Sequence, residues 1–549
     1  MNNFSVLIGG KAGDGINQAS LTIARIINQL GYRINVYYDY PSLIRGGHNF
    51  SIIRASKNKI AVHRDKIDCL LALNQETLDS HKSKLNDNAF IIYNSDEIKS
   101  EGLGIPLDTI IKEEKASFVM RNSCLIGAFC KSMGIKYKTL EAVFKKHITK
   151  ETELNLEIAL KGYNAAKELT QIEPLNQTAL PILTGGEAVG LGLVKGGLKA
   201  YLAYPMTPVS NLLHYLAGLA DELNLKVIHP ENEIAVMLMS LGFTYAGQRV
   251  AVGTSGGGFC LMTEGLSLSG MAELPITIVM GQRPGPSTGM PTYSAQSDLH
   301  FILNAGQGEF PRFIVAPGDA EESYAWSAFA LDISWKYQMP SFIMVDKTLS
   351  EGTFNFDIAA LDELKRPETV LWDRQQPYKR YLNTETGISP LAFVPDKDAV
   401  IKVNSYEHEE SGLTTEEPDS VKKMQLKRLR KDDCLKKEMA GYETVKVYGN
   451  KNSSTALLCW GSNKGVCVEA AEIFGLKVIH VLVLSPFPEK QLRESFSKVD
   501  RIICVENNAT AQLVRLINSY GFKADKKILK YDGRSFSLDE LETKLRQVL

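Results

Sequence analysis

Four polar or glycine-rich segments follow one another in the middle of the chain, and each carries a group that could take part in chemistry. They are YPMTP at 204–208, PENEIA at 230–235, TSGGG at 254–258 and GQRPGPSTG at 281–289. The guanidinium of Arg283 offers a forked pair of donors that suits a carboxylate, and Thr207 offers a hydroxyl. Glu231 and Glu233 offer carboxylates that could bind or transfer a proton. These side chains are the first candidates for catalysis and substrate binding.

Three of the four segments directly follow apolar runs that are typical of buried strands, at 202–204, 249–252 and 276–280. A helical segment is expected at 233–246. Strands that alternate with helices predict a parallel α/β sheet, in which ligands bind in the crevice beyond the carboxyl ends of the strands. We therefore expect the four segments to face one crevice.

The four segments, taken in this order, resemble the thiamine-pyrimidine domain of the 2-oxoacid:ferredoxin oxidoreductases. The resemblance extends to Met262 and Glu264 after TSGGGF and to the QSDL tetrapeptide at 296–299. It implies a multi-domain α/β fold, thiamine diphosphate as the cofactor, and Glu233 as the carboxylate that activates the cofactor through its pyrimidine nitrogen. Glu231 is the nearby rival, and a charge that stabilises the start of a helix is the structural alternative for either residue.

The same resemblance assigns the substrate carboxylate to Arg283 and Thr207, and contacts with the cofactor to Thr254 and Ser255. Capping of turns at strand ends is the alternative role for Arg283 and Thr207. The implied reaction is oxidative decarboxylation of a 2-oxoacid, with coenzyme A as the acyl acceptor and ferredoxin as the electron acceptor, or the reverse carboxylation. The fused gamma–alpha order most resembles the 2-oxoglutarate enzymes, while pyruvate and branched or aromatic 2-oxoacids remain open as substrates.

Two hypotheses from other classes compete with this one. The sequence GTSGG at 253–257 fits the G-x-S-x-G pattern of serine hydrolases and follows a strand, which would make Ser255 a nucleophile with Asp298 and His300 as partners. Asp298 and His300 stand too close together in the chain to suit a base and the group that orients it, and an H-G-G-G oxyanion loop is missing. The third hypothesis is a non-catalytic scaffold that binds a nucleotide or coenzyme A.

The first domain is expected at 1–175 and begins with a strand, the glycine-rich loop GGKAGDG at 9–15 and an amphipathic helix. Such a loop could bind a phosphate at the helix N-terminus or could be a tight structural turn. The motifs AGDGI and YPSLIRGGHNF resemble the gamma domain of the same oxidoreductases, which implies proximity to coenzyme A, although an architectural role is the alternative. The candidates for contacts with its phosphates or pantetheine are Lys11, Ser42 and Arg45.

The rest of the chain divides into three expected parts. The thiamine-binding domain is expected at 176–370, a polar and turn-rich connecting segment at 371–444, and a last domain at 445–549. In the last domain, strand-like apolar runs occur at 455–462, 478–484 and 501–506. Its ENNATAQL segment resembles the transketolase-C-like domain of the family, for which we expect a structural role.

Charge and hydropathy exclude some partners. The 549 residues contain 62 Lys and Arg against 63 Asp and Glu, which leaves a formal net charge of −1. This balance predicts neither a nucleic-acid partner nor attraction to an anionic membrane surface. Because no apolar run reaches the ~18 residues of a membrane span and no signal peptide is recognised, we expect a cytoplasmic protein.

The cysteines show where a metal cluster is not expected. The eight Cys include no C-x-x-C pair, so neither a zinc knuckle nor a ferredoxin-type cluster is predicted, and no metal ligand is assigned in this chain. The resemblance implies that a beta subunit holds the [4Fe-4S] cluster and the Mg2+ that binds the diphosphate. We therefore expect a chain that is inactive alone and works in a heterodimer, or a dimer of heterodimers, with ferredoxin as a further partner.

Overall fold

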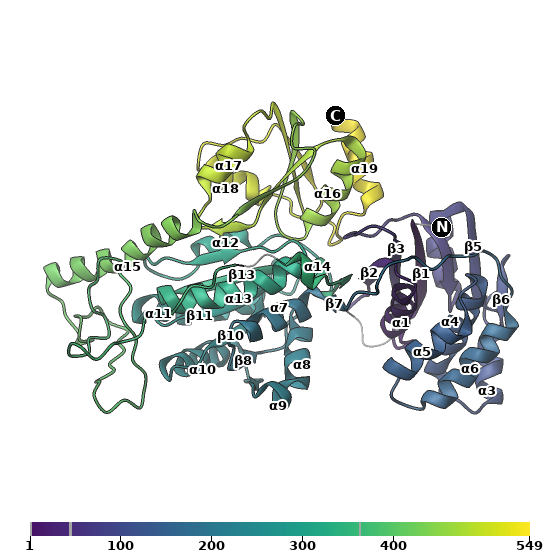
Figure 1. Ribbon diagram of the computed structural model, residues 1–549, viewed down its shortest axis with the longest axis horizontal. Coiled ribbons are helices and arrows are strands. Elements are labelled where there is room, and N and C mark those ends of the chain that lie inside the picture. Colours follow the sequence, from purple (N-terminus) through teal and green to yellow (C-terminus); the bar gives the residue numbers. More distant parts are fainter. Residues whose placement is uncertain (1–2, 43–46, 362–363) are drawn as a thin grey trace. The chain divides into compact units, whose positions relative to one another are not determined.

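The computed structural model describes residues 3–42, 47–361 and 364–549 (Figure 1). It contains two compact units, each built from segments that are distant in the sequence. The first unit comprises Met1–Leu183, Gly352–Asp357 and Phe536–Leu549. The second comprises Thr184–Glu351 and Ile358–Ser535. The candidate residues therefore divide into one set in each unit.

An eight-stranded mixed sheet forms the centre of the first unit, in the order β6-β5-β4-β1-β3-β2-β14-β7. Its strands are β1 Asn3–Lys11, β2 Arg33–Asp39, β3 His48–Ser56, β4 Ile67–Ala72, β5 Leu85–Asn94, β6 Leu103–Ile105, β7 Ile182–Thr184 and β14 Thr353–Asn355. The strand β1 runs parallel to β4 and antiparallel to β3. Its interior residues are all buried, which explains the apolar run at the start of the chain.

Helices complete the first unit. They are α1 Ile16–Gln29, α2 Gln75–His81, α3 Leu107–Glu113, α4 Arg121–Ser132, α5 Tyr137–His147, α6 Thr152–Ala165 and α19 Leu538–Val548, with short 3-10 turns η1 Lys82–Lys84 and η2 Phe118–Met120. The apolar face of α1, including Ile23 and Ile27, shares one core with Val6 and Ile8 of β1. The predicted helix after the glycine-rich loop is thus confirmed.

The second unit contains a seven-stranded sheet in the order β18-β12-β13-β11-β10-β8-β9. Its strands are β8 Ala200–Ala203, β9 Lys226–Ile228, β10 Val250–Ser255, β11 Ile276–Gln282, β12 Phe313–Val315, β13 Pro340–Asp346 and β18 Val483–Ser485. All neighbours are parallel except β18, which is antiparallel to β12. Every residue of β10, β11 and β13 is buried, as expected of a parallel sheet that is covered on both faces.

Helices on both faces complete this layer of the second unit. They are α7 Gly185–Lys195, α8 Ser210–Gly218, α9 Ala220–Leu223, α10 Glu233–Tyr245, α11 Gly256–Ala272, α12 Leu299–Asn304, α13 Ala320–Tyr337 and α14 Lys347–Glu351, followed by η3 Ile358–Ala360. The helix α10 packs on α11, and α13 packs on α7 and against β11 and β13. The first turn of α10 is capped by Asn232, whose Oδ1 accepts a hydrogen bond from the Ala235 N–H at 2.9 Å.

A five-stranded sheet in the order β15-β17-β16-β19-β20 forms the last layer of the second unit. Its elements are β15 Val445–Gly449, β16 Thr455–Cys459, β17 Lys477–Val481, β19 Arg501–Glu506, β20 Lys526–Leu529, α16 Asn463–Phe474, α17 Glu489–Ser495 and α18 Gln512–Asn518. Together the three sheets confirm the predicted α/β class with parallel-rich domains.

One expected strand of this last layer is wrong. The apolar run 478–484 is two strands in different sheets, because β17 pairs within the five-stranded sheet whereas β18 pairs with β12. Between them, the N–H groups of Leu482 and Val483 both donate to the Thr444 carbonyl. The chain therefore changes sheets within an uninterrupted run of buried side chains, which a hydropathy pattern does not show.

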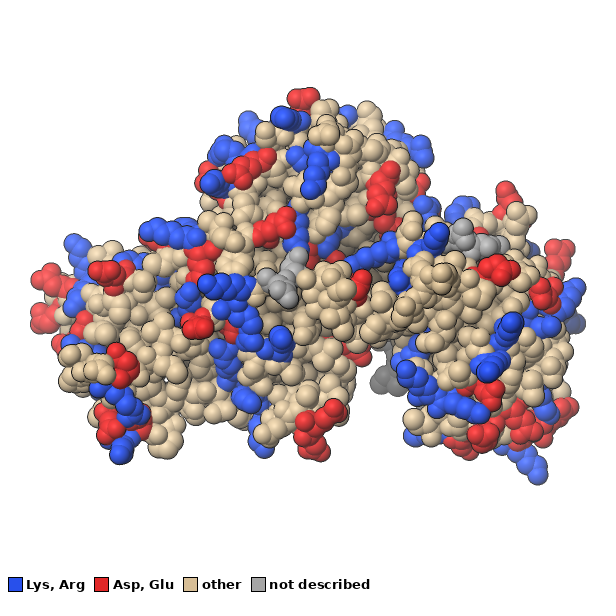
Figure 2. Space-filling model, in the orientation of Figure 1, with Lys and Arg blue, Asp and Glu red and all other residues tan. Residues whose placement is uncertain are grey.

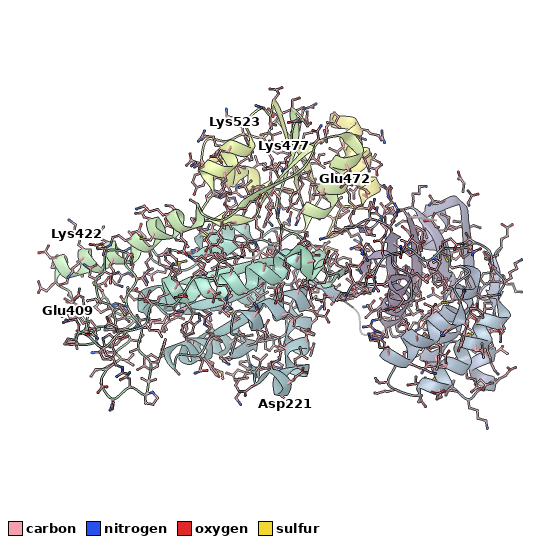
Figure 3. The ribbon with its side chains drawn as sticks, in the orientation of Figure 1. Asp221, Glu409, Lys422, Glu472, Lys477 and Lys523 are labelled. Carbon is pink, nitrogen blue, oxygen red and sulfur yellow. The ribbon has the colours of Figure 1, made fainter. Side chains whose placement is uncertain are left out.

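The connecting segment contains a long helix, α15 Pro418–Met439, that carries the basic run of the sequence. Lys422 near its start is exposed (Figure 3), whereas Lys427 and Lys431 are buried and form ion pairs with Glu273 at the end of α11. Lys427 Nζ lies 2.7 Å from Glu273 Oε1. The helix is therefore anchored by buried charges to the layer built on the seven-stranded sheet.

The surface carries both signs of charge intermixed. Figure 2 shows Lys and Arg side chains among Asp and Glu side chains on the visible face, in keeping with the net charge of −1. Within the described residues, no helix is long and apolar enough to cross a membrane.

Candidate active site

The carboxyl ends of three neighbouring strands bring the central segments together, as the sequence predicts. In the sheet, Gly253 of β10 lies opposite Ala203 of β8, and Ser255 lies opposite Gly281 of β11. The loop after β8 contains Thr207, and the carbonyl of this residue accepts a hydrogen bond from Arg283 Nη1 at 3.1 Å. The segments after β8, β10 and β11 therefore meet at one edge of the sheet.

Glu233 is the buried acid of this region. It is the first residue of α10 and is only 5% exposed, whereas Glu231 two residues earlier is exposed. A β-carbon built on Gly258 would lie 2.4 Å from both Glu233 Oε1 and Thr254 Oγ1, so these three residues share one corner. Among the described residues, the Glu233 carboxylate has no hydrogen-bond or ion-pair partner. With no protein partner, the carboxylate oxygens of Glu233 can accept a hydrogen bond from a ligand.

Arg283 is the buried cation of the same region. It follows β11 and is 9% exposed, and its Nε atom has no hydrogen-bond partner in the described structure. Burial lowers the pKa of the guanidinium, and the nearby Asp298 carboxylate partly offsets this effect. Because only the Thr207 carbonyl engages its Nη1 group, part of the fork is free to bind an anion.

Ser255 does not form the constellation of a serine hydrolase. Its Oγ is buried and has no hydrogen-bond partner in the described structure. The ring Nε2 of His300 lies 2.9 Å from the Gln512 carbonyl oxygen, within reach of a hydrogen bond, and so is engaged away from Ser255. Since a serine nucleophile requires a base in contact with its hydroxyl, the geometry gives the hydrolase hypothesis no support.

The segment 296–300 is held in place by the five-stranded layer. The Gln296 side chain donates to the Trp460 carbonyl at 2.8 Å, and Gln512 Nε2 donates to the Ser297 carbonyl at 2.6 Å. Ser297 Oγ in turn donates to the Arg283 carbonyl at 3.3 Å. The C-terminal layer, expected to be structural, thus also positions residues beside the crevice. The QSDL motif was visible in the sequence, but its hydrogen bonds to the five-stranded layer could not be predicted from it.

Asp298 has surroundings in the structure that differ from its expected role in a serine hydrolase. It was a candidate only for the hydrolase hypothesis, yet the structure places its carboxyl beside the start of α11, where a β-carbon on Gly256 would lie 2.8 Å from Asp298 Oδ1. Its Oδ2 atom is shielded from water and has no hydrogen-bond partner in the described structure. Burial raises the pKa of this carboxyl to about 7, against the opposing effect of Arg283.

Of the candidates in the first unit, Lys11 is the last residue of β1 and Ser42 follows β2. Lys11 and Ser42 are exposed, and Arg45 lies outside the described residues. The Lys11 N–H donates to Asp14 Oδ2 at 2.7 Å, and Arg121 forms an ion pair with Asp14 at 2.9 Å. A carboxylate of the loop itself thus takes a backbone N–H that a phosphate could use, which favours a structural turn at this loop.

Known proteins with similar sequences show which family this chain belongs to. A family model described as pyruvate flavodoxin/ferredoxin oxidoreductase, thiamine diphosphate-binding, matches residues 192–427, and a pyruvate ferredoxin/flavodoxin oxidoreductase model matches residues 5–165. A 2-oxoacid:ferredoxin oxidoreductase subunit alpha from Sulfolobus sp is 30% identical over 99% of this chain and 97% of its own length. The chain belongs to the 2-oxoacid:ferredoxin oxidoreductase family. It is an oxidoreductase alpha subunit with a thiamine diphosphate-binding domain. As an alpha subunit, it has a partner chain.

Other members of the 2-oxoacid:ferredoxin oxidoreductase family match over the full length. The 2-oxoglutarate oxidoreductase subunit KorA from Mycobacterium tuberculosis is 25% identical over 100% of this chain and 92% of its own length. The solved 2-oxoglutarate:ferredoxin oxidoreductase from Magnetococcus marinus, with 2-oxoglutarate, coenzyme A and succinyl-CoA bound, has a TM-score of 0.90. It is 27% identical to this chain, with 100% of this chain and 99% of the other covered.

The crowded corner at Gly258 gives a direct test of this candidate site. Gly258→Ala would push a methyl group into Glu233 and Thr254, so we expect 2-oxoacid-dependent dye reduction by the assembled complex to fall by about 10²-fold, as for a misplacement of roughly 1 Å. Gly257→Ala is the matched control in the same helical turn, where the nearest atom would be Ser287 O at 3.5 Å. Equal activity of the two variants, with equal melting temperatures, would show that this corner is not part of the site.

Proposed function

We propose that this chain is the alpha subunit of a thiamine diphosphate-dependent enzyme that converts 2-oxoglutarate and coenzyme A to succinyl-CoA and CO2, with electrons passed to ferredoxin, or runs the reverse carboxylation. The observation that carries the proposal is the presence, at the ends of the neighbouring strands β10 and β11, of Glu233 beside Thr254 and of Arg283 with a partly free fork. The likeness to the Magnetococcus marinus enzyme, whose structure holds 2-oxoglutarate and coenzyme A, supports the choice of substrates.

The residues present fit the cofactor. A buried carboxylate without a protein partner suits a ring nitrogen that must carry a proton, and Gly258 leaves the corner beside it open where a β-carbon would fill it. Thiamine diphosphate supplies, when bound, a nucleophilic carbon for the 2-oxo group and an electron sink for decarboxylation. Glu233 would hold the proton at the pyrimidine nitrogen, and Thr254 and Ser255 at the carboxyl end of β10 are the other proposed contacts with the cofactor.

The substrate carboxylate is assigned to Arg283. Its guanidinium is buried, retains a free Nε, and is fixed by the Thr207 carbonyl, so it can orient an anion without being immersed in water. The Thr207 hydroxyl is proposed as a second contact. Orientation of the carboxylate over the cofactor places the bond to be broken and so lowers the entropic part of the barrier.

The remaining parts of the machinery are proposed to come from elsewhere. The absence of a C-x-x-C pair supports a [4Fe-4S] cluster in a beta subunit, which would also hold the Mg2+. The proposed assembly is a heterodimer or a dimer of heterodimers that meets ferredoxin in the cytoplasm. For coenzyme A, Lys11, Ser42 and Arg45 remain the proposed contacts.

Viologen reduction by the anaerobically isolated native complex tests the substrate assignment. We expect reduction that requires both 2-oxoglutarate and coenzyme A, with little reduction when pyruvate replaces 2-oxoglutarate. A preference for pyruvate or for a branched or aromatic 2-oxoacid would keep the mechanism and overturn the substrate. Absence of reduction with every 2-oxoacid, in a complex that contains its iron-sulfur partner, would overturn the enzyme function and leave the scaffold hypothesis.

A further inference from the structure

Asp298 lies beside Arg283 and is tied to the same strand end. Its backbone N–H donates to Gln282 Oε1 at 3.3 Å, and the preceding Ser297 donates to the Arg283 carbonyl at the same distance. These bonds hold the backbone at Asp298 to the strand end that carries Arg283, and the Arg283 charge acts on the Asp298 carboxyl although no hydrogen bond joins the two side chains. Oδ2 of Asp298 and Nε of Arg283 are both left without partners in the described structure.

We propose that Asp298 is a positioning residue that acts through Arg283, because a 2-oxoacid carboxylate binds to Arg283 together with a proton that is taken up by Asp298. This inference rests on the proposed function of Arg283 as the substrate-carboxylate site. The physical reason is charge: an ionised Asp298 already balances Arg283, whereas a protonated Asp298 leaves the cation free for the incoming anion.

The surroundings of Asp298 support this coupling. Among the described residues, Arg283 is the charged group that influences the Asp298 carboxyl. The neighbours Gln282 from β11 and Gly256 from α11 are uncharged. On its own helix, the His300 ring nitrogen faces the carbonyl of Gln512. Since burial raises the pKa of Asp298 to about 7, both charge states are populated near neutral pH. A bound substrate anion would raise this pKa further.

The sign of the pH dependence follows from this linkage. Substrate binding is strongest below the pKa of Asp298, where the carboxyl is neutral, and weakens as the pH rises through this pKa. The affinity falls by at most tenfold per pH unit, which corresponds to about 1.4 kcal/mol of binding free energy. The KM for the 2-oxoacid should therefore rise between about pH 6 and about pH 8, and kcat/KM should fall over the same range.

The test is the pH profile of KM and kcat in the assembled complex. In Asp298→Asn the side chain stays neutral, so we expect a KM that is flat with pH and about threefold to tenfold below the native value at about pH 8. Asp298→Ser is a second neutral variant with the same expectation. The matched control is Asp346→Asn, since Asp346 also has a raised pKa, about 6 from burial, but is hydrogen-bonded to Ser462 and the Leu349 N–H.

The outcomes separate this inference from the proposed function. A native complex that turns over 2-oxoacids, with unchanged KM–pH profiles in both Asp298 variants, would overturn the role of Asp298 alone. A KM that rises in Asp298→Asn at every pH would likewise contradict it, because this result indicates a structural contact. A complex without activity toward any 2-oxoacid would instead overturn the function itself. A flattened profile in the Asp346 control would assign the titration to another group.

Discussion

Replacing Glu233 with Gln is expected to lower kcat of the assembled complex by about 10²–10⁴-fold, the range for loss of a positioned acid–base group. Gln keeps the shape of the side chain but carries no charge, so it cannot hold a proton on the cofactor's pyrimidine nitrogen. The corner formed with Gly258 and Thr254 would remain filled to the same extent. The measurement is 2-oxoacid-dependent viologen reduction at saturating substrate and saturating thiamine diphosphate.

Glu231→Gln is the matched control for this variant, because Glu231 stands two residues earlier and is exposed. We expect it to retain native turnover and native assembly. If Glu233→Gln assembles with its partner and turns over at the native rate, Glu233 is not the activating carboxylate. If Glu231→Gln lowers kcat instead, Glu231 is the activating carboxylate.

Replacing Arg283 with Ala is expected to lower kcat/KM by roughly 30-fold to 5,000-fold, which corresponds to the about 2–5 kcal/mol lost when one partner of a buried, hydrogen-bonded charge pair is truncated. The loss arises because the substrate carboxylate would enter a desolvated site without its counter-charge. Arg283→Lys keeps the charge but loses the fork, so an intermediate loss is expected. The measurement is the initial rate over a range of 2-oxoacid concentrations.

Arg374→Ala serves as the control for removal of a positive charge, since Arg374 forms surface ion pairs with Asp396 and Asp398. We expect this control to leave KM within error of the native value. If KM is unchanged in Arg283→Ala and the complex melts at the native temperature, Arg283 does not bind the substrate. Its role would then be to cap the turn at Thr207.

The parts of the fold that follow from local patterns could be predicted from the sequence. The amphipathic helix expected after the loop at 9–15 is α1, which begins at Ile16, because the loop glycines precede a regular apolar stripe. The run 501–506 coincides with β19 because both its ends are polar. The meeting of Thr207, Ser255 and Arg283 at one edge follows from the parallel sheet itself.

Features that depend on distant segments could not be predicted in this way. The switch of sheets between β17 and β18 occurs inside one apolar run, so periodicity carries no sign of it. The burial of Lys427 and Lys431 on α15 depends on Glu273, more than a hundred residues earlier, which compensates their charges. The environment of Asp298 depends on Gln512, from a layer that the sequence marked only as structural.

We propose that this chain provides one half of a thiamine diphosphate site. The most direct measurement is anaerobic viologen reduction with 2-oxoglutarate and coenzyme A by the separately purified chain, by its partner chain, and by both mixed, each after removal and re-addition of thiamine diphosphate and Mg2+. We expect no reduction by either chain alone, and reduction by the mixture only when the cofactor is restored. Turnover by this chain alone, or turnover by the mixture that persists without thiamine diphosphate, would contradict this proposal.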